Sequence, residues 1–283
     1  MSTAAEPNPA AAFSGASRLL LLTLVLTGAW LALNFALPEL SPSGVPTVIV
    51  RATIHCLILM GLWLGLGRAG FDARTRAYVW LAVAIPFTAW LGIITQLALD
   101  GAFRPRPGVP ALPLAIFVPV LVGLALLLRS KRIAAVLDAT PPAWLIGLQA
   151  YRVFGGIFLV GWARGNLSGT FALPAGIGDV AVGLLALPVA TYLASGARGR
   201  RLAAYGWNIL GLVDFALAIG IGFLSTPGPF QMIVPDRPNV LLGAYPTVMI
   251  PAFAVPSSIL LHALSIWQLN RLGRRARQST SAP

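Results

Sequence analysis

The residues of this chain that could do chemistry are a few charged side chains inside apolar segments. Asp179 lies in the run LPAGIGDVAVGLLALP (173–188), and Arg152 and Asp214 lie in two other runs of the same kind. Arg51 and His55 are four residues apart, so a helix would present them on one face. Because a charged group at the centre of a bilayer costs about 2.5 to 3.5 kcal/mol, none of these side chains is expected to face lipid.

The most economical arrangement is an interior cluster in which two arginines face two aspartates, with His55 nearby. We expect Asp179 to pair with Arg152 or Arg51. Two roles are open for this cluster. Buried ion pairs can hold neighbouring helices in register without any chemistry. Alternatively, the cluster lines a polar cavity that opens to the outer side and binds an ion, a proton or a small polar solute.

Other chemistries have less support. Asp179 and Asp214 together could act as acid and base on a lipid or isoprenoid substrate, but the sequence contains no HExxH, GxSxG or Walker motif. The single cysteine, Cys56, excludes a disulfide or a cysteine metal site within the chain. His55 and His262 would differ in depth by roughly 9 Å, which does not favour a haem between them. We therefore assign no catalytic residue, metal or cofactor.

Composition excludes most soluble classes of protein. Of the 283 residues, 57% are hydrophobic and 10% are charged, against roughly a quarter charged in soluble domains. The mean hydropathy is +0.82. The net charge of +12 could suggest nucleic acid, but the basic residues fall in small groups between apolar runs, and no basic helix with interleaved aromatic residues is present. We predict no nucleic-acid partner.

Eight apolar runs are long enough to cross a bilayer as helices. They cover residues 18–38, 47–68, 77–99, 111–129, 143–163, 173–195, 203–224 and 246–270. The sequence therefore predicts an all-α membrane protein, with one transmembrane domain of about eight helices at 18–270. Residues 1–17 are predicted to be a disordered cytoplasmic tail, and residues 271–283 a basic cytoplasmic tail.

The distribution of Lys and Arg predicts the orientation of these spans. With the N-terminus inside, 14 of the 20 basic residues fall on the cytoplasmic side, four fall on the other side, and Arg51 and Arg152 lie within spans. The cytoplasmic set is Arg18, Arg68, Arg74, Arg76, Arg129, Lys131, Arg132, Arg198, Arg200, Arg201, Arg271, Arg274, Arg275 and Arg277. This bias follows the positive-inside rule and predicts eight crossings with both ends cytoplasmic.

Prolines and glycines predict where the spans bend and where they approach closely. The connection 225–246 contains five prolines, so it cannot be one helix, and it could cap a cavity or insert partway. Pro251 and Pro256 are expected to distort the last span. Gly176 and Gly183 flank Asp179 on its own helical face, and Gly211 precedes Asp214 by three residues, so neighbouring helices could approach there.

The segments YRVFGGIFL, LPAGIGD and WNILGLVD, between about residues 150 and 218, resemble uncharacterised bacterial multi-spanning membrane proteins. The resemblance implies a location in the bacterial cytoplasmic (inner) membrane, and it attaches no activity.

Together these features favour a small-solute or proton-coupled transporter-like protein. Its partners would be the lipid bilayer and a small solute or proton, bound by Arg51, His55, Arg152, Asp179 and Asp214. Two alternatives stay open: a membrane-embedded enzyme acting on a lipid or isoprenoid, and a non-catalytic scaffold that binds another protein. The sequence does not indicate an oligomeric state.

Overall fold

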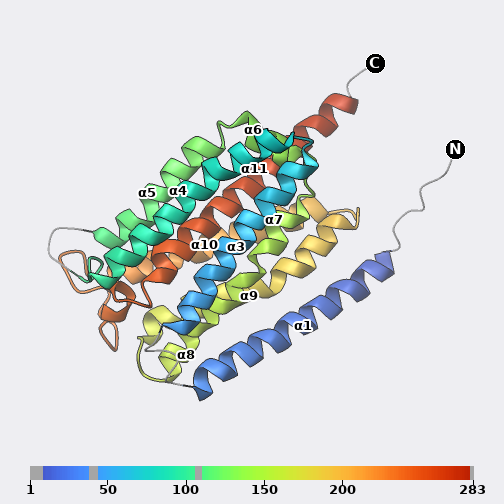
Figure 1. The fold of residues 1–283 in the computed structure, drawn as a ribbon. Helices are drawn as coiled ribbons and strands as arrows, with labels where there is room; N and C mark the ends of the chain where they lie inside the picture. The colour runs from blue at the N-terminus through green and yellow to red at the C-terminus, as the bar shows by residue number, and fades with distance from the viewer. Residues whose placement is uncertain (1–8, 38–43, 106–109, 281–283) are drawn as a thin grey trace.

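The computed structural model describes residues 9–37, 44–105 and 110–280, which form helices and turns without strands (Figure 1). The elements are α1 (Pro9–Ala36), α3 (Val45–Arg68), α4 (Ala73–Leu99), α5 (Ala111–Leu127), α6 (Lys131–Ala139), α7 (Ala143–Gly147), η1 (Leu148–Gly156), α8 (Ile157–Ala163), α9 (Gly169–Ala194), α10 (Arg200–Leu224), η2 (Val240–Gly243), η3 (Ile250–Ala254) and α11 (Val255–Thr280). η1 and η2 are 3₁₀-helices, and η3 is a π-helix. The predicted all-helical class is confirmed.

Seven segments of the described chain are long and apolar enough to cross a membrane. α5 and α6 add an eighth if the pair is counted as one span, although the two helices are bent by 83° at their junction. The prediction of about eight apolar spans agrees with this arrangement.

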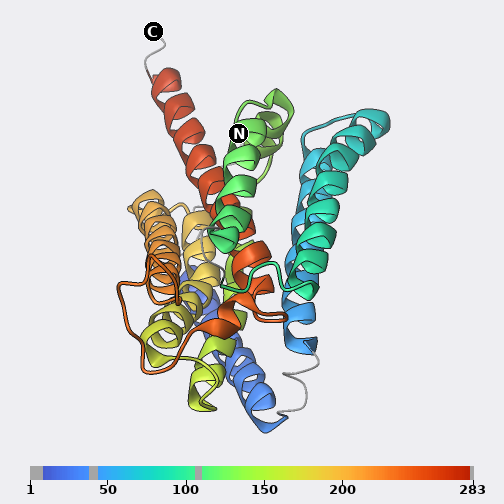
Figure 2. The ribbon, with the colours of Figure 1, turned by 90° about the vertical axis from the view of Figure 1, so that its left-hand side faces the viewer.

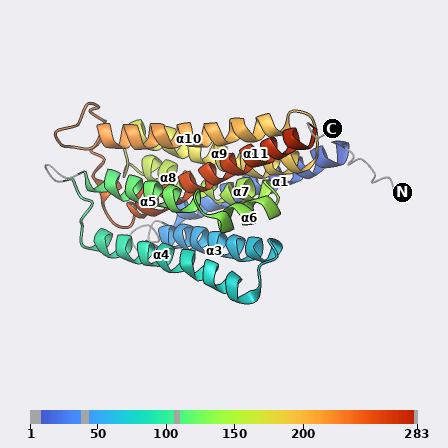
Figure 3. The ribbon, with the colours of Figure 1, turned by 90° about the horizontal axis from the view of Figure 1, so that it is seen from above.

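The helices run back and forth between two ends of one bundle. Viewed from above, α3 and α4 form one side, α10 forms the opposite side, and α7 and α11 run between them (Figure 3). The perpendicular view gives the same order, with α3 and α4 paired on the right (Figure 2). The start of α1 and the end of α11 lie at the same end of the bundle in Figures 1 and 3.

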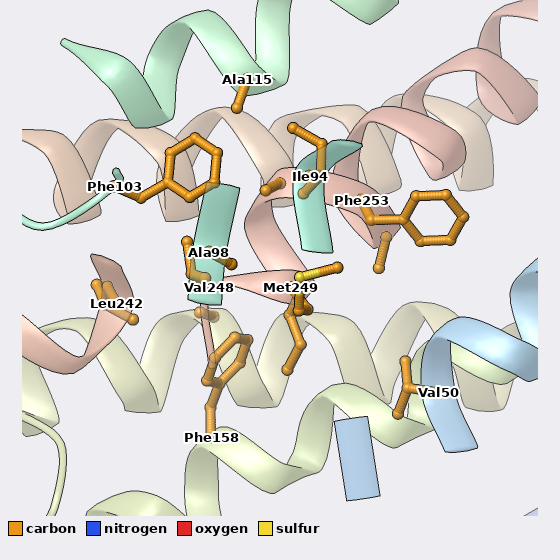
Figure 4. Packing of buried hydrophobic residues seen from close by; sticks show 14 of the residues in the cluster. Val50, Ile94, Ala98, Phe103, Ala115, Phe158, Leu242, Val248, Met249 and Phe253 are labelled. Atoms are coloured by element: carbon orange, nitrogen blue, oxygen red, sulfur yellow. The ribbon is translucent and has the colours of Figure 1, made fainter. Parts of the chain in front are cut away.

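The largest buried cluster surrounds the segment that leads into the last span. Val248, Met249 and Phe253 are almost completely excluded from solvent and pack among residues of α3, α4, α5, α8 and α9 (Figure 4). Pro251 lies inside the π-helical turn η3, and Pro256 is the second residue of α11, directly after that turn. A proline lacks the N–H that an α-helix needs, and the wider turn absorbs the missing bonds.

Both predicted tails are partly helical. α1 already begins at Pro9 and α11 continues to Thr280, so residues 9–17 and 271–280 are not irregular segments. Residues 1–8 and 281–283 lie outside the described residues.

The sequence prediction also missed α6, a short amphipathic helix. Ile133, Val136 and Leu137 face the interior, while Lys131 and Arg132 are exposed.

α6 is fixed to the last span by an ion-pair network. Arg271 donates to both carboxylate oxygens of Asp138, at 2.9 and 2.5 Å, and Arg275 donates to one of them at 2.5 Å. The hydrogen bonds from Arg271 lower the pKa of Asp138 below its usual value, and this is the largest effect. The positive charges of Arg271 and Arg275 and the hydrogen bond from Arg275 lower the pKa further. The predicted basic tail thus begins as part of the folded bundle.

Candidate functional site

A single buried arginine holds both interior aspartates. Nε of Arg152 donates to Oδ1 of Asp179 at 2.8 Å, and Nη2 donates to Oδ2 of Asp214. The Arg152 residue is 3% exposed. One guanidinium from η1 therefore bridges carboxylates of α9 and α10, and we call Arg152, Asp179 and Asp214 the charged triad.

The other terminal nitrogen of Arg152 contacts a histidine. Nη1 lies 3.1 Å from Nε2 of His262, and Nδ1 of His262 lies 3.0 Å from Oδ1 of Asn208. Because a guanidinium can only donate, Nε2 must accept and Nδ1 carries the proton, which it donates to Asn208. Nδ2 of Asn208 donates to Oγ of Ser265 at 3.1 Å. These contacts hold His262 as one neutral tautomer and extend the network along α11.

The four ionisable groups meet because they lie at one level of the bundle. Asp179 follows the start of α9 by about three helical turns, and Asp214 precedes the end of α10 by about the same distance. Arg152 precedes the end of α8, and His262 follows the start of η3, again by about three turns. All four are therefore about 15 to 19 Å from the same end of the bundle. Asp179 lies deeper than predicted because its helix begins at Gly169 instead of residue 173.

Glycines provide the space for the triad. A Cβ at Gly155 would collide with the carboxylate of Asp179, and a Cβ at Gly178 would collide with that of Asp214. A Cβ at Gly211 would overlap the ring of His262. The prediction that Gly211 permits close approach agrees with this geometry. Gly155 and Gly178 were not predicted.

The two glycines that flank Asp179 make room for the neighbouring span. A Cβ at Gly183 would lie 2.5 Å from the backbone nitrogen of Val153, and one at Gly176 would lie 2.7 Å from the Leu159 side chain. Both approaches were expected from the small-residue pattern. η1 therefore packs its backbone directly on α9.

The structure does not bring Arg51 and His55 into the triad. Nη2 of Arg51 lies 3.4 Å from the Tyr245 hydroxyl, and Nε2 of His55 lies 3.2 Å from Oγ1 of Thr88. Neither side chain forms an ion pair with an aspartate in the described part of the chain. The predicted cluster of two arginines and two aspartates is therefore wrong in this respect.

The rotation of α3 about its own axis explains the difference. Val50 and Ile54, each one position before the predicted residue, line a small pocket that Arg152 and Asp179 also line. Consecutive positions on a helix point about 100° apart. The face of α3 that meets the triad is consequently apolar.

A cavity of about 140 Å³ opens beside the carboxylates. On α9 its wall is formed by Phe171, Ala175 and Asp179, and on α10 it runs from Phe223 down to Asp214. Both aspartates are thus the innermost lining residues on their helices. Thr226–Phe230 and η2 also line this cavity, so the proline-rich connection 225–246 forms part of its wall.

Two polar side chains that the sequence left outside the predicted cluster, His262 and Asn208, belong to the triad's network. His262 was placed too deep because the last span was counted from residue 246 instead of from Ile250, where η3 begins.

Gln149 lies on η1 three residues before Arg152, and neither polar atom of its fully buried amide has a hydrogen-bond partner among the described residues. Within those residues, no three His, Cys, Asp or Glu side chains gather as metal ligands would.

Comparisons with known proteins give a family and no activity. No curated protein and no solved structure matches the sequence. One family matches residues 109–270, a range that includes the triad, Asn208 and His262 and excludes Arg51 and His55. Since the match covers more than half of the 283 residues, the chain belongs to the family described as a domain of unknown function (DUF8737).

Proposed function

We propose that this protein is a multi-pass membrane carrier that couples the movement of a small solute to a proton bound at the charged triad. In this proposal the bundle crosses a bacterial cytoplasmic membrane eight times, with both ends in the cytoplasm, as the basic residues favour. The triad then lies near mid-membrane, where transporter sites are commonly found.

One observation carries the proposal: two carboxylates share one guanidinium at the inner end of a cavity. With both aspartates ionised, the triad has a net charge of −1, because His262 is neutral in its hydrogen-bonded tautomer. An uncompensated charge in a low-dielectric interior is costly. Binding one proton or one cation removes that charge, and the cavity gives either of them a route to the carboxylates.

Irregular helices on two sides of the triad support the same function. η1 is a nine-residue 3₁₀ segment that carries Arg152, whereas such segments rarely exceed three or four residues. The span that carries His262 begins with the π-helical turn η3. Interrupted helices at a mid-membrane site are typical of secondary transporters, in which they hold substrate and coupling ion.

A pH jump tests this function without knowledge of the solute. Proteoliposomes adsorbed on a solid-supported electrode would be switched from about pH 8 to about pH 6, a range that avoids titrating ordinary carboxylates. Proton binding within the membrane should give a transient current in the wild type. Asp214→Asn should abolish the current, because its amide cannot be charged.

Asp100→Asn is the matched control, since Asp100 is an exposed carboxylate at the end of α4. This variant should keep the wild-type current. The proposal would be wrong if the wild type gave no current, or if Asp214→Asn gave the same current as Asp100→Asn.

A further inference from the structure

The cavity beside the triad is an apolar chamber with its polar groups at the inner end. Its walls include Phe158, Phe171, Phe215, Phe223, Phe230 and Leu242. The carboxylates of Asp179 and Asp214 lie at its deepest level. A ligand that fills this space therefore needs an apolar body and a polar group at one end.

Asp214 offers a free acceptor at that inner end. Its side chain is 9% exposed, and Oδ2 accepts from Arg152. Oδ1 has no hydrogen-bond partner within the described residues. An ionised carboxylate can accept hydrogen bonds at both oxygens, so Oδ1 is available to a ligand that supplies a donor.

The sign of the charge selects the kind of donor. A protonated amine would bring the net charge of the site from −1 to zero, whereas an anion would make that net charge more negative, at −2. Aromatic rings along the walls also attract cations through their faces. Arg104 lines the opposite end of the cavity, where its side chain is exposed and its charge is screened by solvent.

The size of the cavity limits the apolar body. The cavity holds about 140 Å³, and an apolar cavity of about 150 Å³ is known to accept benzene. One aromatic ring or a short branched alkyl group therefore fits, and a lipid chain does not.

We propose that this cavity binds a protonated primary amine whose body is the size of one ring, with its ammonium group on Asp214. This inference rests on the proposed carrier function and names its substrate class. The amine and the coupling proton would neutralise the same triad, so each would bind when the other has left.

The test measures equilibrium binding to the full chain in phosphatidylcholine nanodiscs by isothermal titration calorimetry. Three probes share one ring: phenethylamine is cationic, 2-phenylethanol is neutral and 3-phenylpropanoate is anionic. We expect the amine to bind at least about tenfold more tightly than either of the others, and Asp214→Asn to lose about tenfold of that affinity. Empty nanodiscs subtract the partitioning of each probe into lipid.

A matched pair of variants on α10 locates the site. Ala218 lines the cavity, whereas Ala216 faces outward. Ala218→Phe should fill the cavity and abolish amine binding, and Ala216→Phe should leave it unchanged. The inference would be overturned by equal binding of the three probes, by no binding of the amine, or by equal amine affinity in the two variants.

The outcomes separate this inference from the proposed function. Amine binding without a pH-jump current would contradict the proposed carrier function and would still support the amine site. A pH-jump current without amine binding would overturn the amine site and leave the carrier function in place.

Discussion

Gly178 lies so close to Asp214 that a methyl group at position 178 would overlap the carboxylate. Gly178→Ala should therefore push Asp214 away from Arg152 and lower the free energy of unfolding by about 1 to 3 kcal/mol, as overpacking does. Fluorescence-detected unfolding in detergent measures this loss. Gly220→Ala, on the same helix as Asp214 with no atom within 4 Å of the added carbon, should be neutral or slightly stabilising. Equal losses in the two variants would contradict the contact.

The triad predicts an asymmetry between its acidic and basic members. Arg152→Met leaves two like charges without a partner and should cost about 3 to 5 kcal/mol of stability. Asp214→Asn leaves one neutral Arg–Asp pair and should be as stable as the wild type or more so. Thermal unfolding of both variants and of the wild type measures the two changes in stability. If Asp214→Asn lost as much stability as Arg152→Met, the triad would act as a structural staple, the other role that the sequence left open.

His262 is predicted to act as a fixed acceptor for Arg152. His262→Phe should cost about 1 to 3 kcal/mol, because it leaves the donor of Arg152 and the carbonyl oxygen of Asn208 unpaired inside the bundle. His262→Gln can accept from one and donate to the other, so it should recover part of that loss. Chemical unfolding of both variants measures the difference. No difference between the two would show that the ring contributes only its volume.

Two fully buried glutamines form a natural comparison. Nε2 of Gln268 donates to the carbonyl oxygens of Leu137 and Thr140, at 2.5 and 2.8 Å, whereas Gln149 has no partner in the described chain. Gln268→Met should destabilise the protein by about 1 to 3 kcal/mol, and Gln149→Met should be neutral or stabilising. Unfolding midpoints under one set of conditions compare them. The reverse order would contradict the hydrogen bonds of both side chains.

Asp138 predicts how stability depends on pH. Because Arg271 lowers the pKa of Asp138 in the folded state, this carboxylate stabilises the protein above its unfolded pKa of about 4 and loses that effect as the pH falls through its folded pKa. The wild type should therefore lose more stability than Asp138→Asn between about pH 5 and pH 3. Unfolding midpoints across that range measure the difference. Parallel curves for the two proteins would contradict the ion pair.

The sequence predicted the long apolar helices and the grouping of three of the five candidate residues for one physical reason. A charged side chain in an apolar run is costly unless it is paired, so Arg152, Asp179 and Asp214 were expected to pair inside the bundle. The same reasoning could not place Arg51, because depth along a helix does not reveal its rotation. The face of α3 toward the triad carries Val50 and Ile54 instead.

Other parts of the site depend on geometry that a pattern does not record. Gln149 and Arg152, three residues apart, share a face in a 3₁₀ segment and in an α-helix alike, so η1 was not distinguishable from an ordinary span. The predicted depth of His262 was wrong because the predicted start of the last span was a few residues too early. The sequence therefore did not predict the contact of His262 with Arg152 at 3.1 Å. The sequence contains many glycines, and it does not indicate that Gly178 is the one that lies against Asp214.

The proposed function depends above all on the uptake and release of a proton by the triad. Infrared difference spectroscopy of the protein in lipid, between about pH 9 and pH 5, reads this directly as the carbonyl stretch of a protonated carboxylic acid. We expect a band in the wild type that persists in Asp100→Asn and disappears in Asp214→Asn, whose remaining aspartate is neutralised by Arg152. A spectrum without that band, or one that Asp214→Asn leaves unchanged, would contradict proton binding at the triad.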